Sequence, residues 1–333
     1  MIGTLFLLLM LSLPQAGEST LSAARRLINE GQPRKAIEQL ESLKAGADAA
    51  LQTQIDLLLG VAYYHADDPA RAVELLAPVV DRLPADSVSR REAEQVLGLS
   101  AAVIGKFADA IPRLEATRKW APDNQELAYA LAQAYVQTQR PDSARATVAS
   151  IYRVPADSAA AHLLVAQLMI RLEIEPQAEV ELTKAVEKDA RLPGANLLLG
   201  QIALFRGRLP EAVSLTQREI AINPGNGMAF SQLGDAYVRQ SNWDDAIAAL
   251  QKSIWLNPYY SGPYILLGKT YLKKKNLSTA EAMLKRAIQF DPNNKSAHYL
   301  LGQVYQQTAR PEDAKREFEI AEKLKNNLDK IEQ

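Results

Sequence analysis

The sequence predicts an all-α protein in which pairs of helices are stacked one after another. Two consecutive segments between Gly227 and Asn294 share a pattern that returns every 34 residues. Within each segment, apolar residues recur at steps of three and four, the spacing of one helix face. Aromatic residues make up 6% of the chain and hydrophobic residues 47%, which suits packed helices better than disorder. A fixed period of this length indicates a repeat array.

A small set of residues defines the repeat. In the first segment they are Leu233, Gly234, Tyr237, Ala246, Leu250 and Pro258, and in the second Leu267, Gly268, Tyr271, Ala280, Leu284 and Pro292. Glycine inside a helix costs about 1 kcal/mol relative to alanine, so we expect close helix packing at these glycines. The ordered signature resembles the tetratricopeptide repeat. This resemblance implies an α-solenoid, a right-handed superhelix whose first helices line a concave wall.

The same register continues through the chain and predicts nine tandem helix-turn-helix repeats. The small residue of the first helix falls at Ala24, Gly60, Gly98, Ala132, Ala166, Gly200, Gly234, Gly268 and Gly302. The predicted repeats span about residues 17–50, 53–86, 91–124, 125–158, 159–192, 193–226, 227–260, 261–294 and 295–328. We expect a single solenoid over residues 17–333, closed by a last helix that runs from Pro311 toward Ile331 as a cap.

Two local features refine this array. An insertion lies around residues 85–90, where the sequence predicts a hinge, a change in superhelical pitch, or a longer second helix in the preceding repeat. Gly31, Gly105 and Gly207 follow first helices, and we expect them to adopt the left-handed conformation that ends a helix.

The first residues differ from the rest. Ile2 to Leu13 carries no charge and is followed by Pro14 and small residues, as in a secretory signal peptide. The stretch is shorter than the roughly 20 residues that a membrane-spanning helix needs. We therefore expect a signal peptide over residues 1–16 and a bacterial, exported chain that is periplasmic or secreted. Two alternatives stay open: an uncleaved N-terminal anchor, or a cytoplasmic chain that starts further along.

Composition and motifs favour a protein without catalytic chemistry of its own. Lys and Arg number 38 against 39 Asp and Glu, so no overall field draws the chain to nucleic acid or to anionic lipid. The chain has no cysteine, and its three histidines lie in different repeats. We predict that it is not an enzyme, holds no cofactor or metal, binds no nucleic acid, and is not inserted in a membrane once mature.

The candidate site is therefore a surface. The residue after the small residue of each first helix is predicted to face the inner wall; these residues are Arg25, Val61, Leu99, Gln133, Gln167, Gln201, Asp235, Lys269 and Gln303. One turn earlier on the same face come Leu21, Leu57, Gln95, Tyr129, Leu163, Leu197, Ser231, Ile265 and Tyr299. Primary amides donate and accept, so a row of them can pair with an extended backbone.

We hypothesise a peptide-binding groove on this wall. Its predicted contact residues are Tyr129, Gln133, Leu163, Gln167, Leu197, Gln201, Lys269 and Gln303. The predicted function is a non-catalytic scaffold that binds a peptide or protein partner and assembles complexes. The alternative is a regulatory or adaptor subunit of a glycan-handling or proteolytic enzyme complex in the cell envelope.

Overall fold

Helices make up all the regular structure in the computed structural model of the chain. Its described residues, 13–331, form eighteen α-helices and no strand, so the all-α class is confirmed. Side chains are described from residue 17 to 324. The described residues divide into two compact units, with the boundary between Met169 and Ile170. The single solenoid stays a prediction, as does the signal peptide, of which residues 1–12 lie outside the described part.

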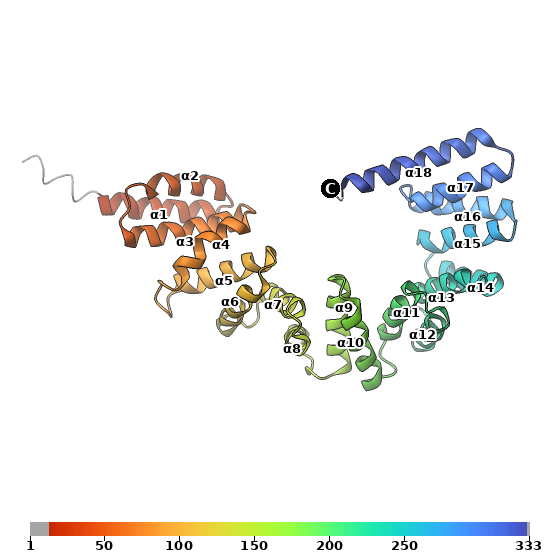
Figure 1. The fold of residues 1–333 in the computed structure, drawn as a ribbon, viewed down its shortest axis with the longest axis horizontal. Coiled ribbons are helices and arrows are strands. Elements are labelled where there is room, and N and C mark those ends of the chain that lie inside the picture. Colours follow the sequence, from red (N-terminus) through yellow and green to blue (C-terminus); the bar gives the residue numbers. More distant parts are fainter. Residues whose placement is uncertain (1–12, 332–333) are drawn as a thin grey trace, which may run out of the picture. The chain divides into compact units, whose positions relative to one another are not determined.

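The helices of each unit follow one another as hairpins (Figure 1). The first unit contains α1 (Leu13–Asn29), α2 (Pro33–Lys44), α3 (Ala49–His65), α4 (Pro69–Val80), α5 (Val88–Val103), α6 (Phe107–Trp120), α7 (Gln125–Gln137), α8 (Pro141–Tyr152) and most of α9 (Ala159–Arg171). The second contains α10 (Glu175–Lys188), α11 (Ala195–Phe205), α12 (Leu209–Ile222), α13 (Gly227–Arg239), α14 (Trp243–Leu256), α15 (Ser261–Lys273), α16 (Leu277–Phe290), α17 (Lys295–Gln307) and α18 (Pro311–Ile331).

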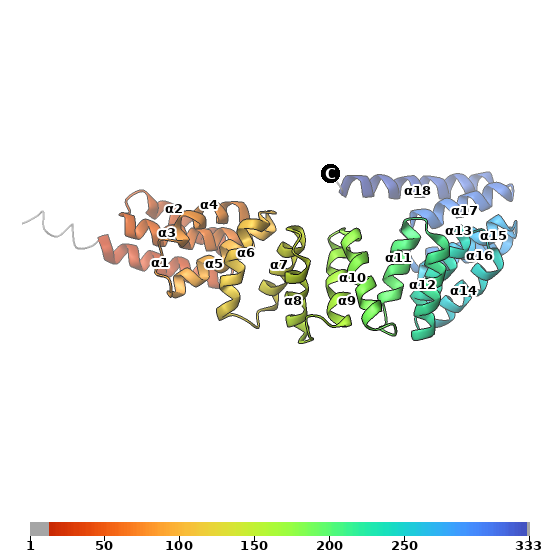
Figure 2. The ribbon, with the colours of Figure 1, turned by 60° about the horizontal axis from the view of Figure 1, so that its bottom comes forward.

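Two kinds of contact build each unit. From α1 to α8 and from α10 to α18, each helix packs on the next helix in the chain, and the two helices of such a hairpin stay side by side in both views, as α3 and α4 do (Figure 2). First helices also contact the first helix of the next hairpin, as in α3 with α5 and α13 with α15. Asn124, Asn226 and Asn294 cap first helices through hydrogen bonds from backbone N–H groups. The first helices therefore form a layer of their own within each unit.

Close packing inside the hairpins explains the repeated glycine, as predicted. A methyl group added at Gly234 would lie 2.5 Å from two carbon atoms of Leu250, a residue of the paired helix. The same clash recurs at Gly60 with Leu76, Gly98 with Leu114, Gly268 with Leu284 and Gly302 with Phe318. At Gly200 the neighbours are polar instead, namely Thr216 and Gln232. Apart from Gly200, these glycines make room for a large side chain on the facing helix.

Every hairpin turn in the described part has one residue with positive φ at the same register. Gly31, Gly105 and Gly207 take this conformation, with φ of 73°, 77° and 72°, as predicted. Other residue types fill the position in the remaining hairpins: Asp67, Gln139, Glu173, Ser241, Lys275 and Ala309. Side chains with a Cβ are strained in this region, because the Cβ approaches the following carbonyl oxygen.

Replacing Ala309, whose φ is 54°, with glycine is therefore expected to stabilise the second unit. The gain should be about 0.5–1 kcal/mol, since the relief of strain is partly offset by a more flexible unfolded chain. Urea unfolding measures this change. The matched control is Gly105→Ala, at a position with no neighbour within 4 Å, which should lose about as much. If both variants were as stable as the wild type, the positive φ at these turns would not be a source of strain.

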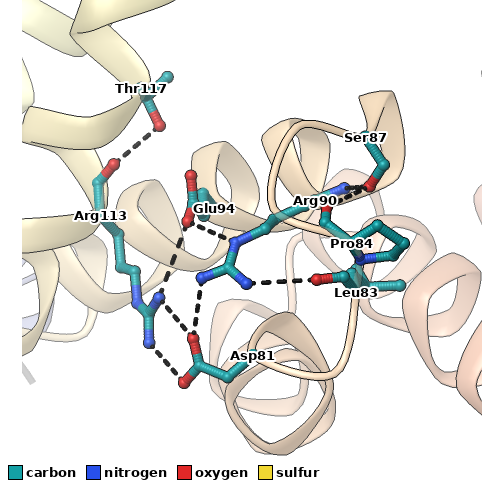
Figure 3. Close-up of polar contacts among 8 residues, drawn as sticks. All are labelled: Asp81, Leu83, Pro84, Ser87, Arg90, Glu94, Arg113 and Thr117. Carbon is teal, nitrogen blue, oxygen red and sulfur yellow. Dashed lines mark hydrogen bonds and ion pairs between the residues drawn. The ribbon is translucent and has the colours of Figure 1, made fainter.

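The insertion at residues 85–90 lies inside the first unit, and the predicted longer second helix is not found. Helix α4 ends at Val80, so it is not lengthened. The extra residues form a connection that ends at Ser87, the N-cap of α5. Helix α5 therefore begins at Val88, three residues before Arg91, where the repeat was expected to start. Figure 3 shows the ion pairs that hold this connection. Arg113 donates to both carboxylate oxygens of Asp81 at 3.1 Å.

Arg90 completes this network from the start of α5. It donates to Asp81 at 3.2 Å, to the Leu83 carbonyl at 3.2 Å and to Glu94 at 3.1 Å. The connection is therefore joined to α5 and α6 by side chains, while the boundary between the units lies after Met169. A hinge at the connection stays a prediction.

This network predicts a dependence of stability on pH. The hydrogen bond and the charge of Arg113 lower the pKa of Asp81, slight burial opposes this, and Arg90 lowers it a little further. A carboxyl whose pKa is lowered by folding stabilises the fold above its unfolded value of about 4, and that contribution is lost as the pH falls through the folded value. Asp81→Asn should therefore lose less stability than the wild type between neutral pH and about pH 3, measured by urea unfolding. An equal loss of stability in Asp81→Asn and in the wild type would contradict the contribution assigned to the Asp81 carboxylate.

The last helix runs from Pro311 to Ile331, as predicted. Ala314 and Ala321 are buried against the preceding hairpin, and Phe318 and Leu324 are half-buried. Side chains beyond Leu324 lie outside the described part. The described portion of the apolar stripe therefore covers α17 and leaves the charged face outside.

Candidate functional site

The candidate site comprises two grooves, one in each unit, lined mainly by first helices. The first groove has a volume of about 540 Å³. The described residues that line it are Tyr64, Leu99, Ala102, Val103, Phe107, Gln125, Glu126, Tyr129, Ala130, Gln133, Ile151 and Tyr152. They come from α3, α5 and α7, with additions from the start of α6 and the end of α8. Neighbouring first helices thus contribute one wall each.

Exposed apolar side chains distinguish the first groove from the surrounding surface. Val103 is 70% exposed, Tyr152 59% and Tyr129 40%. Phe107 and Tyr64, which are half-buried, extend the apolar surface between them. Contiguous exposed apolar groups of this kind mark sites where a protein binds something else.

One carboxylate contributes the charge of the first groove. Glu126, on the first turn of α7, is the only charged residue among the described residues of the lining. Burial raises the pKa of the Tyr64 hydroxyl, and the charge of Glu126 and its hydrogen bond with that hydroxyl raise it further. Tyr64 therefore remains protonated beside the Glu126 carboxylate at the groove wall.

The second groove, of about 420 Å³, is more polar. Its described lining residues are Leu197, Gln201, Leu204, Met228, Ser231, Gln232, Asp235, Tyr260, Gly262, Ile265, Leu266, Asn294 and Ser296. Several of its polar groups already have partners. Gln232 donates to the Leu197 carbonyl at 3.2 Å and to the Thr216 hydroxyl at 2.8 Å. Asp235 accepts from Arg239 at 3.0 Å, and Asn294 caps α17.

The predicted site residues fall into three groups. Tyr129 and Gln133 line the first groove, and Leu197 and Gln201 line the second. Leu163, Gln167, Lys269 and Gln303 line neither of these two grooves. A continuous row of glutamines through Gln133, Gln167 and Gln201 stays a prediction, because each groove lies within one unit.

Sequence reasoning missed part of each lining. Tyr64, Val103 and Glu126 line the first groove although they lie outside the two predicted positions of the repeat. They stand one turn further along the same helix face, so a search extended by three or four residues in each direction would have included them. In the second repeat the predicted inward residues Leu57 and Val61 are buried, because α3 is covered by its neighbouring helices.

The described residues were searched for two other features, a metal site and a membrane-spanning helix. Within the part of the chain that the structure describes, no group of three or more His, Cys, Asp or Glu residues could hold a metal ion. None of the helices from residue 13 onward combines the length and apolar character needed to cross a membrane.

Comparison with solved structures finds proteins that are similar to parts of this chain. MamA from Desulfovibrio magneticus RS-1 is 19% identical, with 51% of this chain and 97% of that chain aligned at a TM-score of 0.47. YrrB, a TPR protein with an unusual peptide-binding site, is 21% identical, with 50% and 87% aligned at a TM-score of 0.43. The Cut9–Hcn1 structure of the APC/C is 16% identical, with 89% and 57% aligned at a TM-score of 0.46. No curated protein matches the chain.

Stacked helical hairpins of nearly constant length define the class of helical-repeat proteins. Family models described as tetratricopeptide repeat or TPR repeat match residues 54–78, 105–168, 193–218, 229–258 and 268–308. These segments fall in both units. The chain therefore belongs to the tetratricopeptide-repeat family.

Proposed function

We propose that this protein is a non-catalytic scaffold that binds segments of partner proteins through the grooves of its first-helix layer. The observation that carries the proposal is the first groove, where Val103, Tyr129 and Tyr152 expose apolar surface beside the amides of Gln125 and Gln133. Apolar rings provide contact area, and amides can pair with the backbone of a bound segment. Stacked repeats provide an extended surface for this purpose.

The grooves differ in how they support the proposal. In the second groove, Leu197 and Gln201 lie beside the exposed side chain of Met228 and the ring of Tyr260. We include Leu163, Gln167, Lys269 and Gln303 as further contact residues on the same helix register, outside both grooves. Changing Gln133, Gln167 and Gln201 together to alanine tests the amide row. Unchanged partner recovery by a variant with unchanged melting would remove that part of the proposal.

Site-specific photocrosslinking tests the proposal directly. A photoreactive phenylalanine analogue at position 129 should crosslink to a partner in extracts of the native source, and mass spectrometry then identifies the linked segment. The matched control is the same analogue at position 74, an exposed glutamate on the second helix α4. Equal crosslinking from both positions, or none from position 129, would contradict the proposal. A single stoichiometric enzyme among the products would favour the role of a regulatory subunit.

We also propose that residues 1–16 act as an export signal. The support is the uncharged stretch that precedes Pro14. N-terminal sequencing of the protein from its native source tests this, and a start at Met1 would contradict it.

A further inference from the structure

The first groove combines a single carboxylate with an aromatic surface. Glu126 lines this groove together with Tyr64, whose pKa it raises, and none of the ion pairs found among the described residues includes Glu126. An ionised carboxylate has about four lone-pair sites, so one phenol donor leaves most of its accepting capacity open. A cation that enters the groove would meet this carboxylate at the wall.

The surroundings of Glu126 suit the other parts of a basic side chain. Tyr129 and Tyr152 are partly exposed in the same groove, and Phe107 and Val103 lie along it. Lysine and arginine place their alkyl stems against apolar surface while the charged head reaches a polar partner. Aromatic faces also attract cations directly. The groove therefore offers a place for both the stem and the head.

The other charged residues near the first groove do not line it. The adjoining hollow, of about 180 Å³, is lined by Asp123 and Arg153, one residue of each sign. Lys106 precedes the lining residue Phe107 in the sequence but does not itself line the groove. The carboxylate of Glu126 is therefore the one charge that a bound segment contacts inside the described lining.

We propose that the first groove selects a segment that carries lysine or arginine next to an aliphatic or aromatic residue. This inference rests on the proposed function. The basic head pairs with Glu126, and the apolar neighbour packs on Tyr129 and Tyr152. The second groove does not share this preference, because its lining carboxylate, Asp235, is already paired with Arg239 at 3.0 Å.

Short labelled peptides test the selectivity with defined probes. We would measure fluorescence anisotropy for peptides in a Gly-Ser frame whose centre reads Phe-Lys-Leu, Phe-Gln-Leu or Phe-Glu-Leu. The lysine peptide should bind about fivefold more tightly than the glutamine peptide, since one partly exposed ion pair contributes up to about 1 kcal/mol. The difference should shrink at high salt, which screens exposed charges.

Variants of the chain test whether Glu126 causes the preference for the lysine peptide. Glu126→Gln should remove the preference for lysine and leave binding of the glutamine peptide unchanged. Glu126→Lys should reverse the preference in favour of the glutamate peptide. The matched control Glu74→Gln, at an exposed glutamate outside the groove, should retain the wild-type preference. Tyr129→Ala should weaken binding of all three peptides, because each loses the packing of its apolar residues on this ring.

The outcomes separate this inference from the proposed function. Equal binding of all peptides to the wild type would overturn the inference and leave the proposed function in place. A lysine preference that survives in Glu126→Gln would also overturn it. If no peptide binds the wild type, the inference fails, and crosslinking from position 129 then decides the proposed function independently.

Discussion

Leu250→Ala is expected to lower the free energy of unfolding of the second unit by about 2–5 kcal/mol, the range for deleting a buried leucine. Leu250 is fully buried in the hairpin of α13 and α14, where its side chain occupies the space left by Gly234. Urea unfolding followed by tryptophan fluorescence measures the loss. Trp243 and Trp255 both lie in α14, so a Trp120→Phe background confines the signal to this unit.

A double variant of Gly234 and Leu250 tests whether these two residues pack directly against each other. Gly234→Ala alone should cost about 1–3 kcal/mol through overpacking, reduced by the roughly 1 kcal/mol that alanine gains over glycine in a helix. In the double variant, the new methyl group fills part of the space vacated by Leu250, so the combined loss should be smaller than the sum. The control is Gly225→Ala, where the nearest atom would be 3.7 Å away. Strict additivity of the two changes would contradict the assigned contact.

His298→Tyr is expected to lower the free energy of unfolding of the second unit by about 2–3 kcal/mol, the cost of leaving the buried Glu317 carboxyl without its hydrogen-bond partner. His298 contacts the Glu317 carboxylate through Nδ1 at 2.6 Å and donates from Nε2 to the Pro292 carbonyl at 2.9 Å. Both side chains are buried. Tyrosine can still reach the Pro292 carbonyl but cannot pair with Glu317.

The preceding repeat supplies the compensating change. At the equivalent position, 34 residues earlier, Tyr264 donates to the Pro258 carbonyl at 3.0 Å, and Met283 occupies the position of Glu317. Met283 packs on the apolar cluster that contains Tyr264. The double variant His298→Tyr with Glu317→Met should therefore recover most of the stability, because the buried carboxyl that lost its partner is replaced by an apolar side chain. A double variant as unstable as His298→Tyr would contradict this explanation.

The hairpin architecture could be predicted because each of its signals is local. The return of Gly234 as Gly268 required a facing large residue, and the structure supplies Leu250 and Leu284. The positive φ of Gly105 followed from glycine's freedom in a turn. The same conformation at Lys275 and Ala309 was not predicted, because these residue types do not favour it and the tertiary structure imposes it.

The grooves could be predicted only in part because they depend on contacts between repeats. The repeat register placed Tyr129 and Gln133 on the correct helix face. It could not show that Tyr64, two repeats earlier, reaches Glu126, since this depends on how neighbouring first helices are offset. The insertion before α5 was detected as a change of period, but its form depends on Arg90 and Arg113 meeting Asp81.

The central claim is that the first groove holds a segment of a partner protein. Hydroxyl-radical footprinting of the chain, with and without the segment identified by crosslinking, tests it most directly. The account predicts that oxidation of Tyr129 and Tyr152 falls on binding, while Trp120 and Tyr259, which are exposed outside both grooves, react as before. Protection of Trp120 or Tyr259 with Tyr129 and Tyr152 unchanged would contradict the account.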